Sequence, residues 1–204
     1  MAETLPVGCA CGAITGEARE LSPRTALHFV CYCVDCRCFA LHLGVGERVL
    51  DEGGGTDLFP MAPARLHLEG KAHLRAIQLS PKGPFRWYAA CCRTPVGNGM
   101  ASADLPFISV LRTFVRADDA AVEAALGPPR GLNGSGATGP TLPGTEAGTG
   151  PGLLLKTALR LAGMRVRGLH RPTPFFDVDG NPIAPPELLS REARNALRAR
   201  ARRS

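Results

Sequence analysis

The sequence predicts a mainly β domain followed by a helical extension at the C-terminal end. Between residues 26 and 115, short apolar runs rich in β-branched and aromatic residues are separated by turn-forming residues, as in a succession of strands. After residue 152 the apolar residues recur at helical spacing instead. With 204 residues, of which 45% are hydrophobic, the chain is large enough to bury a core.

The expected strands follow one another through the first 115 residues. The run ALHFVCYC at 26–33 leads into a cysteine cluster, and RLHLEGKAHLRAIQLS at 65–80 predicts two strands folded about a Glu-Gly-Lys turn at 69–71. Further strands fit FRWYAACC at 85–92 and FISVLRTFV at 107–115. No internal repeat is apparent.

The expected helices come later in the chain. A short one is predicted at 120–126, with Asp118 or Asp119 as its N-cap and a Gly-Pro pair after its end. A second covers LLLKTALRLAGMRVRG at 153–168, with basic residues on one face. The third follows two prolines within the basic segment 185–204.

These elements divide the chain into three parts: a domain at 1–126, a Gly- and Pro-rich segment at 127–152, and a basic, partly helical extension at 153–204. In the middle segment 14 of 26 residues are Gly or Pro, and large apolar residues are nearly absent. Such a segment cannot bury enough apolar surface to offset the entropy of ordering it. It is predicted to be a flexible linker or a long surface loop. In the extension, two adjacent phenylalanines within PTPFFDV at 172–178 have little reason to be exposed, so they predict docking onto the β core or onto a partner subunit. The second alternative would make the protein a homo-oligomer.

The formal net charge of +6 comes from the C-terminal part. Residues 1–151 hold 13 Lys and Arg against 14 Asp and Glu, whereas residues 152–204 hold 11 against 4. Such a tail could bind nucleic-acid phosphates, or its first helix could lie on an anionic membrane. A charge run is usually a solvated face, however, and the strand-rich part lacks interleaved aromatic residues for base stacking, so nucleic acid is the lesser alternative.

Localisation bears on what the cysteines do. No stretch approaches the ~20 apolar residues needed to cross a bilayer, and the first residues lack the pattern of a signal peptide. We therefore expect a cytoplasmic protein without a membrane span. Reducing surroundings disfavour disulfides and favour cysteines that bind metal or carry out redox chemistry.

The eight cysteines fall into three groups, which are Cys9 and Cys11, then Cys31, Cys33, Cys36 and Cys38, then Cys91 and Cys92. Cys-x-Cys places two sulfurs on one side of an extended backbone, and Cys-x-x-Cys brings two more together through a turn. Cys31, Cys33 and Cys36 can therefore supply three convergent ligands to zinc, which prefers thiolate and imidazole ligands. A fourth ligand position would remain open, as in catalytic zinc sites.

Other interpretations of the cysteines stay open. Cys33 and Cys36 alone match the spacing of a dithiol redox pair, although such pairs open a helix in a βαβ setting that the sequence does not indicate. Cys38 fits a buried free cysteine better than a fourth ligand, and Cys91 fits the core better than a metal site.

Several other residues are interpreted without a chemical role. Asp35 and Arg37, on either side of Cys36, fit solvated loop charges, and Trp87 fits a core anchor. The five histidines are scattered without metal-ligand spacing, so none is assigned to a site.

The order C-x-C-G, then C-x-C-x-x-C-R, then C-x-T-P after a tryptophan resembles the family of glutathione-dependent formaldehyde-activating enzymes and centromere protein V. The resemblance covers roughly residues 5–115 and is carried by Cys9, Cys11, Gly12, Cys31, Cys33, Cys36, Arg37, Trp87, Cys92, Thr94 and Pro95. It implies a zinc-binding β-tent fold, in which antiparallel sheets meet around a structural zinc, with a second zinc beside the active site. It also implies carbon–sulfur lyase activity.

Carried over residue by residue, the three-ligand zinc falls on Cys31, Cys33 and Cys36, and the structural zinc falls on Cys9, Cys11 and Cys92. The chain departs from the family motif C-x-x-C-G-T, because Ala89 stands at the first ligand position and Arg93 at the glycine. Cys91 could substitute, although adjacent residues of a strand point to opposite faces and a bulge would be needed. The other options are a three-ligand site or no metal there, which gives one or two zinc ions per chain.

A zinc held by three thiolates can bind and deprotonate an incoming thiol, and a thiolate is the nucleophile needed to add sulfur to a carbonyl. The preferred function is therefore a carbon–sulfur lyase acting on a small thiol adduct, which the resemblance makes glutathione-like. Arg37 and Arg93 are candidate cations for a substrate carboxylate. The alternative is a non-catalytic, zinc-stabilised binding module whose basic tail contacts nucleic acid or another anionic partner.

Overall fold

A computed structural model describes residues 2–203. Its strands are β1 (Glu3–Gly8), β2 (Thr15–Leu21), β3 (Phe29–Cys31), β4 (Thr56–Met61), β5 (Leu66–Glu69), β6 (Leu74–Gln78), β7 (Phe85–Ala89), β8 (Thr94–Gly99), β9 (Ile108–Leu111), β10 (Arg130–Leu132) and β11 (Glu187–Leu188). The α-helices are α1 (Val34–His42), α2 (Gly46–Val49), α3 (Asp119–Leu126), α4 (Pro151–Val166) and α5 (Arg191–Ala201). Short 3₁₀ turns are η1 (Pro63–Arg65), η2 (Lys71–His73), η3 (Arg112–Phe114) and η4 (Gly134–Gly136).

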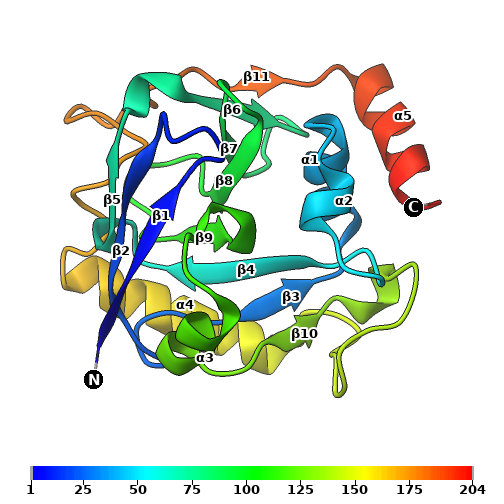
Figure 1. Cartoon of the computed structure of the whole chain (residues 1–204), viewed down its shortest axis with the longest axis horizontal. Helices are drawn as coiled ribbons and strands as arrows, with labels where there is room; N and C mark the ends of the chain where they lie inside the picture. Colours follow the sequence, from blue (N-terminus) through cyan, green and yellow to red (C-terminus); the bar gives the residue numbers. More distant parts are fainter. Residues whose placement is uncertain (1, 204) are drawn as a thin grey trace.

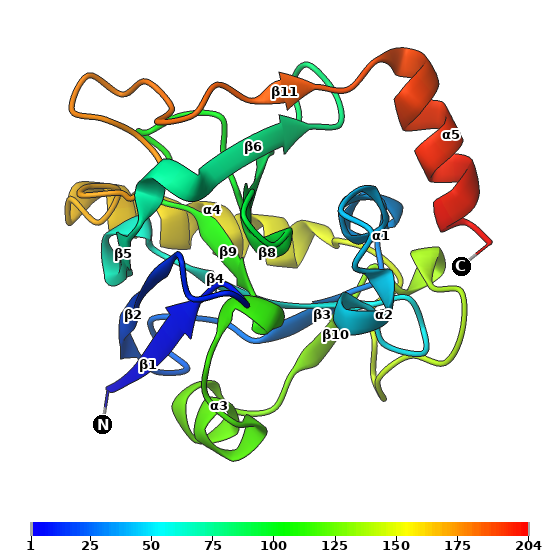
Figure 2. The same ribbon diagram turned by 45° about the horizontal axis from the view of Figure 1, so that its top comes forward.

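The strands form two sheets, which confirms the mainly β prediction. One has three strands in the order β1-β2-β5, and the other has eight in the order β10-β3-β4-β9-β8-β7-β6-β11. Figures 1 and 2 show the three-stranded sheet at one end of the molecule and α1, α2 and α5 at the other. No helix within the described residues is long and apolar enough to span a membrane.

The chain passes from the small sheet to the large one at Gly70. This residue has a φ of 68°, and a Cβ there would collide with the carbonyl oxygen of Ala13, so glycine is required. The two strands predicted within 65–80 are present, but their pairing as a hairpin is wrong. β5 pairs with β2 and β6 pairs with β7, because the 3₁₀ turn η2 redirects the chain between the sheets.

Two edge strands depart from the expected antiparallel arrangement. β10 runs parallel to β3, with Leu132 opposite Cys31, and β11 runs parallel to β6. Both follow long excursions of the chain rather than tight hairpins, so nothing local imposes an antiparallel direction. Through β10, residues 127–152 become a surface loop attached to the large sheet.

The same loop is held along its length by hydrogen bonds to the β domain. The backbone N–H of Leu142 donates to the Tyr32 hydroxyl at 3.1 Å, and the N–H of Thr138 donates to the Gly53 carbonyl at 3.0 Å. Between the two alternatives raised from composition, the structure has a long surface loop and not a free tether.

The core confirms Trp87 as an anchor, since its side chain is fully buried. The ring of Phe175 lies 4.9 Å from that of Trp87, and Phe176 stacks on Phe85 at 6.1 Å. The two adjacent phenylalanines therefore dock onto the β core, which satisfies one of the two expectations for them. The packing of Phe175 and Phe176 against these rings ties the C-terminal extension to the first 126 residues.

The predicted helices are present, and α3 has the predicted ends. The Asp118 carboxylate accepts a hydrogen bond from the Ala121 N–H at 2.8 Å, and Gly127 follows with a φ of 77°. α5 is opened in the same way by Ser190, whose hydroxyl accepts from the Ala193 N–H at 3.1 Å.

His28 joins three segments of the β domain. Its Nδ1 donates to the Gly127 carbonyl at 2.8 Å and its Nε2 lies 3.0 Å from the Asp57 carboxylate, so each nitrogen faces an acceptor and requires a proton. Burial disfavours the imidazolium, but the hydrogen bond and charge of Asp57 outweigh it, and the pKa of His28 is raised above its usual 6.5.

We expect the His28 contact to stabilise the fold fully below pH 6.5 and to be lost as the pH rises through the raised folded pKa. Urea unfolding at a series of pH values should show the free energy of unfolding of the wild type declining above pH 6.5 relative to a His28→Asn variant. His42→Asn is the control: burial lowers the pKa of His42, so this variant should keep the wild-type decline. Equal slopes for wild type and His28→Asn would contradict the prediction.

Candidate metal centres

Four thiols meet where the turn after β1 faces the turn between β7 and β8. The Sγ of Cys11 lies 3.5 Å from that of Cys9 and 3.3 Å from that of Cys91. Cys91 Sγ is 3.7 Å from Cys9 Sγ and 3.9 Å from Cys92 Sγ, and all four atoms lie within 4.8 Å of one another. Four sulfurs bound tetrahedrally at about 2.3 Å from zinc would be about 3.8 Å apart, so this four-cysteine cluster fits the ion.

The expectation that Cys91 belongs to the core is wrong, because it is exposed and lies in the four-cysteine cluster. Ala89 stands at the first ligand position of the C-x-x-C-G-T motif of the formaldehyde-activating family, and in this structure it is fully buried. Strand β7 ends at Ala89, so the alternation of faces that separates adjacent residues in a strand no longer applies at Cys91 and Cys92. Arg93 then closes the turn with a φ of 57°, and its N–H donates to the Ala89 carbonyl at 2.8 Å.

Backbone donors support the other half of the four-cysteine cluster. The N–H of Ile14 donates to Cys9 Sγ at 3.2 Å, and the N–H of Ala10 donates to the Thr94 hydroxyl at 3.0 Å. Burial opposes ionisation of Cys92, but hydrogen bonds from Thr94 and Cys11 outweigh it and lower its pKa to about 6. The cluster therefore favours thiolate at one sulfur before any metal binds.

The second group, Cys31, Cys33 and Cys36, lies where β3 ends and α1 begins, and its Sγ atoms are within 4.8 Å of one another. Cys33 is the N-cap of α1, so the CVDC stretch does open a helix, contrary to the sequence interpretation. The positive end of the helix faces the sulfurs and favours thiolate. We call this group the three-cysteine centre.

Hydrogen bonds within the three-cysteine centre concentrate negative charge on one sulfur. The thiols of Cys33 and Cys36 donate to Cys31 and lower its pKa to about 2, whereas the pKa values of both donors are raised. A further donor comes from the long loop: the side-chain N–H of Asn133 lies 3.3 Å from Cys31 Sγ. Cys38 is outside the centre and buried, as expected, and burial raises its pKa to about 11.

Arg37 is not a solvated loop charge, because its side chain is buried in the middle of the site. The guanidinium donates to four backbone carbonyls, those of Gly54 at 3.2 Å, Ala201 at 2.7 Å, Gly136 at 2.8 Å and Tyr32 at 3.5 Å. These acceptors come from four separate segments of the chain. One side chain therefore fixes the start of α1, the long loop and the end of α5 relative to one another.

Helix α5 lies beside α1, as both views show (Figures 1 and 2). Arg198 donates through two nitrogens to the Asp35 carboxylate, at 3.2 and 2.8 Å, so Asp35 is half-buried in an ion pair rather than solvated. Arg194 also contacts the core, at the Leu79 carbonyl. Part of the basic charge that motivated the nucleic-acid alternative is thus used inside the molecule.

A cavity of about 490 Å³ opens beside the three-cysteine centre. It is lined by Cys33, Val34, Arg37, Asn133, Ser135, Gly136, Ala137, Thr138 and Arg202. Asn133 and Arg202 were not predicted to belong to this site: Asn133 contacts Cys31 from the long loop, and Arg202 lines the cavity from the end of α5. The Asn-Gly pair at 133–134 was a usable signal, because Asn133 has the left-handed conformation typical of such pairs, with a φ of 58°.

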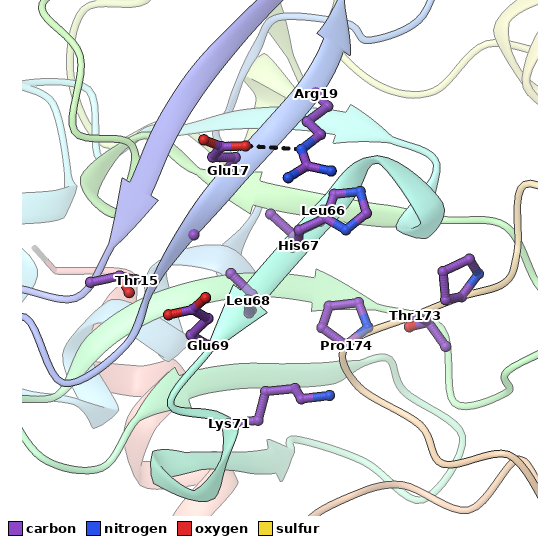
Figure 3. A pocket seen from close by; sticks show the side chains of 12 residues that line it. Thr15, Glu17, Arg19, Leu66, His67, Leu68, Glu69, Lys71, Thr173 and Pro174 are labelled. Atoms are coloured by element: carbon purple, nitrogen blue, oxygen red, sulfur yellow. Dashed lines mark hydrogen bonds and ion pairs between the residues drawn. The ribbon is translucent and has the colours of Figure 1, made fainter.

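A second hollow of about 540 Å³ lies over the three-stranded sheet, under the segment 172–174 (Figure 3). Its charged groups are Glu17, Arg19, Glu69 and Lys71, whose charges cancel, and Glu17 already pairs with Arg19 at 2.9 Å. None of its lining residues is a cysteine. The chemistry of the molecule therefore points to the cysteine groups and not to this hollow.

Comparison with known proteins places the chain in a family but gives it no function. The search of curated proteins found no match. A family model described as a family of unknown function, DUF6151, matches residues 1–187, which includes the β domain, the long loop and most of the C-terminal extension. The chain therefore belongs to the DUF6151 family.

Proposed function

We propose that the protein is a zinc-binding, β-tent carbon–sulfur lyase that acts on a small thiol adduct at the three-cysteine centre. The observation that carries the proposal is the convergence of Cys31, Cys33 and Cys36 beside a cavity that Cys33 lines. The four-cysteine cluster supports a structural zinc, because four protein ligands leave no position for a substrate. The resemblance to the formaldehyde-activating family supports the same assignment.

A zinc held by three thiolates supplies an open ligand position at which a thiol loses its proton and becomes a nucleophile. The protein's own residues prepare that position. The N-terminus of α1 and the Asn133 amide favour negative charge on the sulfurs, and Arg37 holds the surrounding segments in place. The half-buried Cys33 faces the cavity, so a small adduct would approach from that side.

Elemental analysis of protein purified under reducing conditions tests the metal part of the proposal. We expect two zinc ions per chain in the wild type and one in each of the variants Cys33→Ala and Cys92→Ala, since each removes a ligand of a different group. Cys38→Ala is the matched control, a buried cysteine outside both groups that should leave both ions in place. Absence of zinc from the wild type, or its loss from the Cys38 variant, would contradict the assignment.

Activity is tested separately, by release of formaldehyde from its hydroxymethyl adduct with a small thiol. The zinc-loaded wild type should accelerate the release, and Cys33→Ala should abolish the acceleration while the four-cysteine zinc remains. If both zinc ions are present and no acceleration is seen with any adduct, the metal assignment stands and the lyase proposal fails.

A further inference from the structure

A third cavity, of about 420 Å³, lies between α2, the start of β8 and the segment that joins β9 to α3. Cavities of this size are typical of small-molecule sites. It shares no lining residue with the cavity at the three-cysteine centre. Part of its wall is apolar, formed by Val45, Val49, Pro95 and Val115. A ligand here would therefore bind away from the thiols of that centre.

The charged groups that line this cavity do not cancel. They are three arginines and one carboxylate. The carboxylate of Asp119 pairs with Arg112 at 2.7 Å, and Arg112 also donates to two backbone carbonyls. The positive charge of Arg112 is therefore used by the protein, whereas that of Arg48 and Arg116 has no counterpart in the lining.

Arg48 and Arg116 both have guanidinium nitrogens to offer to a ligand. Arg48 is exposed, and between residues 2 and 203 its side chain forms no hydrogen bond or ion pair, although three carboxylates border a neighbouring hollow that it also lines. Arg116 uses its Nε to donate to the Gly8 carbonyl at 2.9 Å, and its two Nη atoms have no partner in the same range. Two cationic donors are thus free at one cavity.

The walls of the cavity are held in place by the fold. The backbone N–H of Arg116 donates to a carbonyl of β1 at 2.8 Å, and the N–H of Ala10 donates to the Thr94 hydroxyl at 3.0 Å. Val45 and Val115 are buried. A site whose walls are already ordered loses less entropy when a ligand binds. The backbone and the apolar wall can therefore receive a ligand without rearrangement.

We propose that this cavity is a binding site for a small phosphate monoester with an apolar body. A phosphate monoester carries a charge of about −1.5 to −2 at pH 7 and three acceptor oxygens, enough to engage both Arg48 and Arg116. The guanidinium fork matches phosphate oxygens geometrically. The apolar wall would contact the ester group and release water from it. The site requires no thiol chemistry, so the inference is independent of the proposed lyase activity.

Calorimetric titration of the full chain at physiological ionic strength tests the ligand class. The probes are phenyl phosphate, inorganic phosphate and benzoate. We expect phenyl phosphate to bind with a dissociation constant below about 1 mM and the other two at least about 10-fold more weakly. Inorganic phosphate lacks the apolar body, and benzoate carries a single charge.

Variants test the place of binding. Arg48→Met should weaken the binding of phenyl phosphate at least about 10-fold, and its melting temperature should stay that of the wild type because Arg48 has no contact to lose. Arg130→Met is the matched control, since Arg130 is exposed and does not line the cavity. Cys33→Ala should also keep the affinity, whereas a phosphate held by a metal at the three-cysteine centre would be lost in this variant.

Three results would overturn the inference. Absence of binding of phenyl phosphate to the wild type would remove the site, and benzoate or inorganic phosphate binding as tightly would contradict the ligand class. Equal losses in the Arg48 and Arg130 variants would reduce the effect to net charge. Loss of binding in Cys33→Ala would move the phosphate to the three-cysteine centre, so this inference would fail while the metal assignment of the proposed function stood.

Discussion

Replacing Arg37 with methionine is expected to lower the free energy of unfolding by roughly 3–5 kcal/mol. Methionine fills much of the volume of the side chain but donates no hydrogen bond, so it leaves the carbonyls of Gly54, Ala201 and Gly136 without their donor. Each buried acceptor left without a partner costs about 1–3 kcal/mol. Urea denaturation followed by tryptophan fluorescence measures the loss, since Trp87 is buried in the core.

A second buried arginine provides the control for Arg37. Arg86 is also buried, but its side chain has one hydrogen bond in the described structure, to the Asn98 side chain at 3.0 Å, and lies over the ring of Phe39. Arg86→Met should therefore cost clearly less than Arg37→Met. Equal costs would show that burial of the charge, and not the four carbonyl contacts, sets the energy. Arg37→Lys should recover only part of the loss, because an ammonium cannot reach acceptors spread over a planar fork.

Removing metal from the four-cysteine cluster is expected to have the other large effect, a fall in melting temperature of about 10–20 °C. Structural zinc contributes its binding free energy to folding, and a loss of about 5 kcal/mol corresponds to such a shift in a chain of this size. The physical reason is local: Cys9 and Cys11 lie in the turn after β1, and Cys91 lies in the turn between β7 and β8, so an ion bound by all three would join the two turns. Thermal unfolding with and without a chelator, in the presence of a reductant, measures the effect.

Single-site variants separate the two metal positions in that experiment. Cys91→Ala should lower the melting temperature nearly as much as the chelator, and the chelator should then have little further effect. Cys33→Ala should be less harmful, because the neighbouring strand β3 and helix α1 are also held by packing and by Arg37. A melting temperature that does not respond to the chelator would rule out a structural ion in the four-cysteine cluster.

Features set by short stretches of sequence could be predicted, whereas contacts between distant segments could not. The cap of α3 depends on Asp118 and the residues just after it, and the convergence of Cys31, Cys33 and Cys36 depends on six consecutive residues. The pairing of β5 with β2 instead of β6 depends on the relative position of two sheets, which no local pattern records. Propensity identifies a strand but not its partner.

The interpretation of Arg37 was wrong for the same reason. A charge in a cysteine-rich loop is usually solvated, and nothing near residue 37 indicates that carbonyls from residues 136 and 201 will surround it. The helix that begins after Cys33 was not predicted, because the sequence indicated a strand at 26–33 and no helix after it. Without that helix the Cys-x-x-Cys pair lacked the setting typical of a redox motif. The position of Cys91 was wrong because the predicted strand at 85–92 runs three residues beyond the true end of β7 at Ala89.

The attachment of Arg37 to residues on both sides of the site has a consequence for the order in which the protein is made. The cysteines at 9, 11, 91 and 92 are all added to the growing chain before the loop at 133–138 and residues 201–202. The cavity at the three-cysteine centre is completed only after the loop at 133–138 and residues 201–202 have followed. We therefore expect the four-cysteine cluster to form before the three-cysteine centre is covered, because the last residues that line its cavity are added more than 160 residues after Cys36.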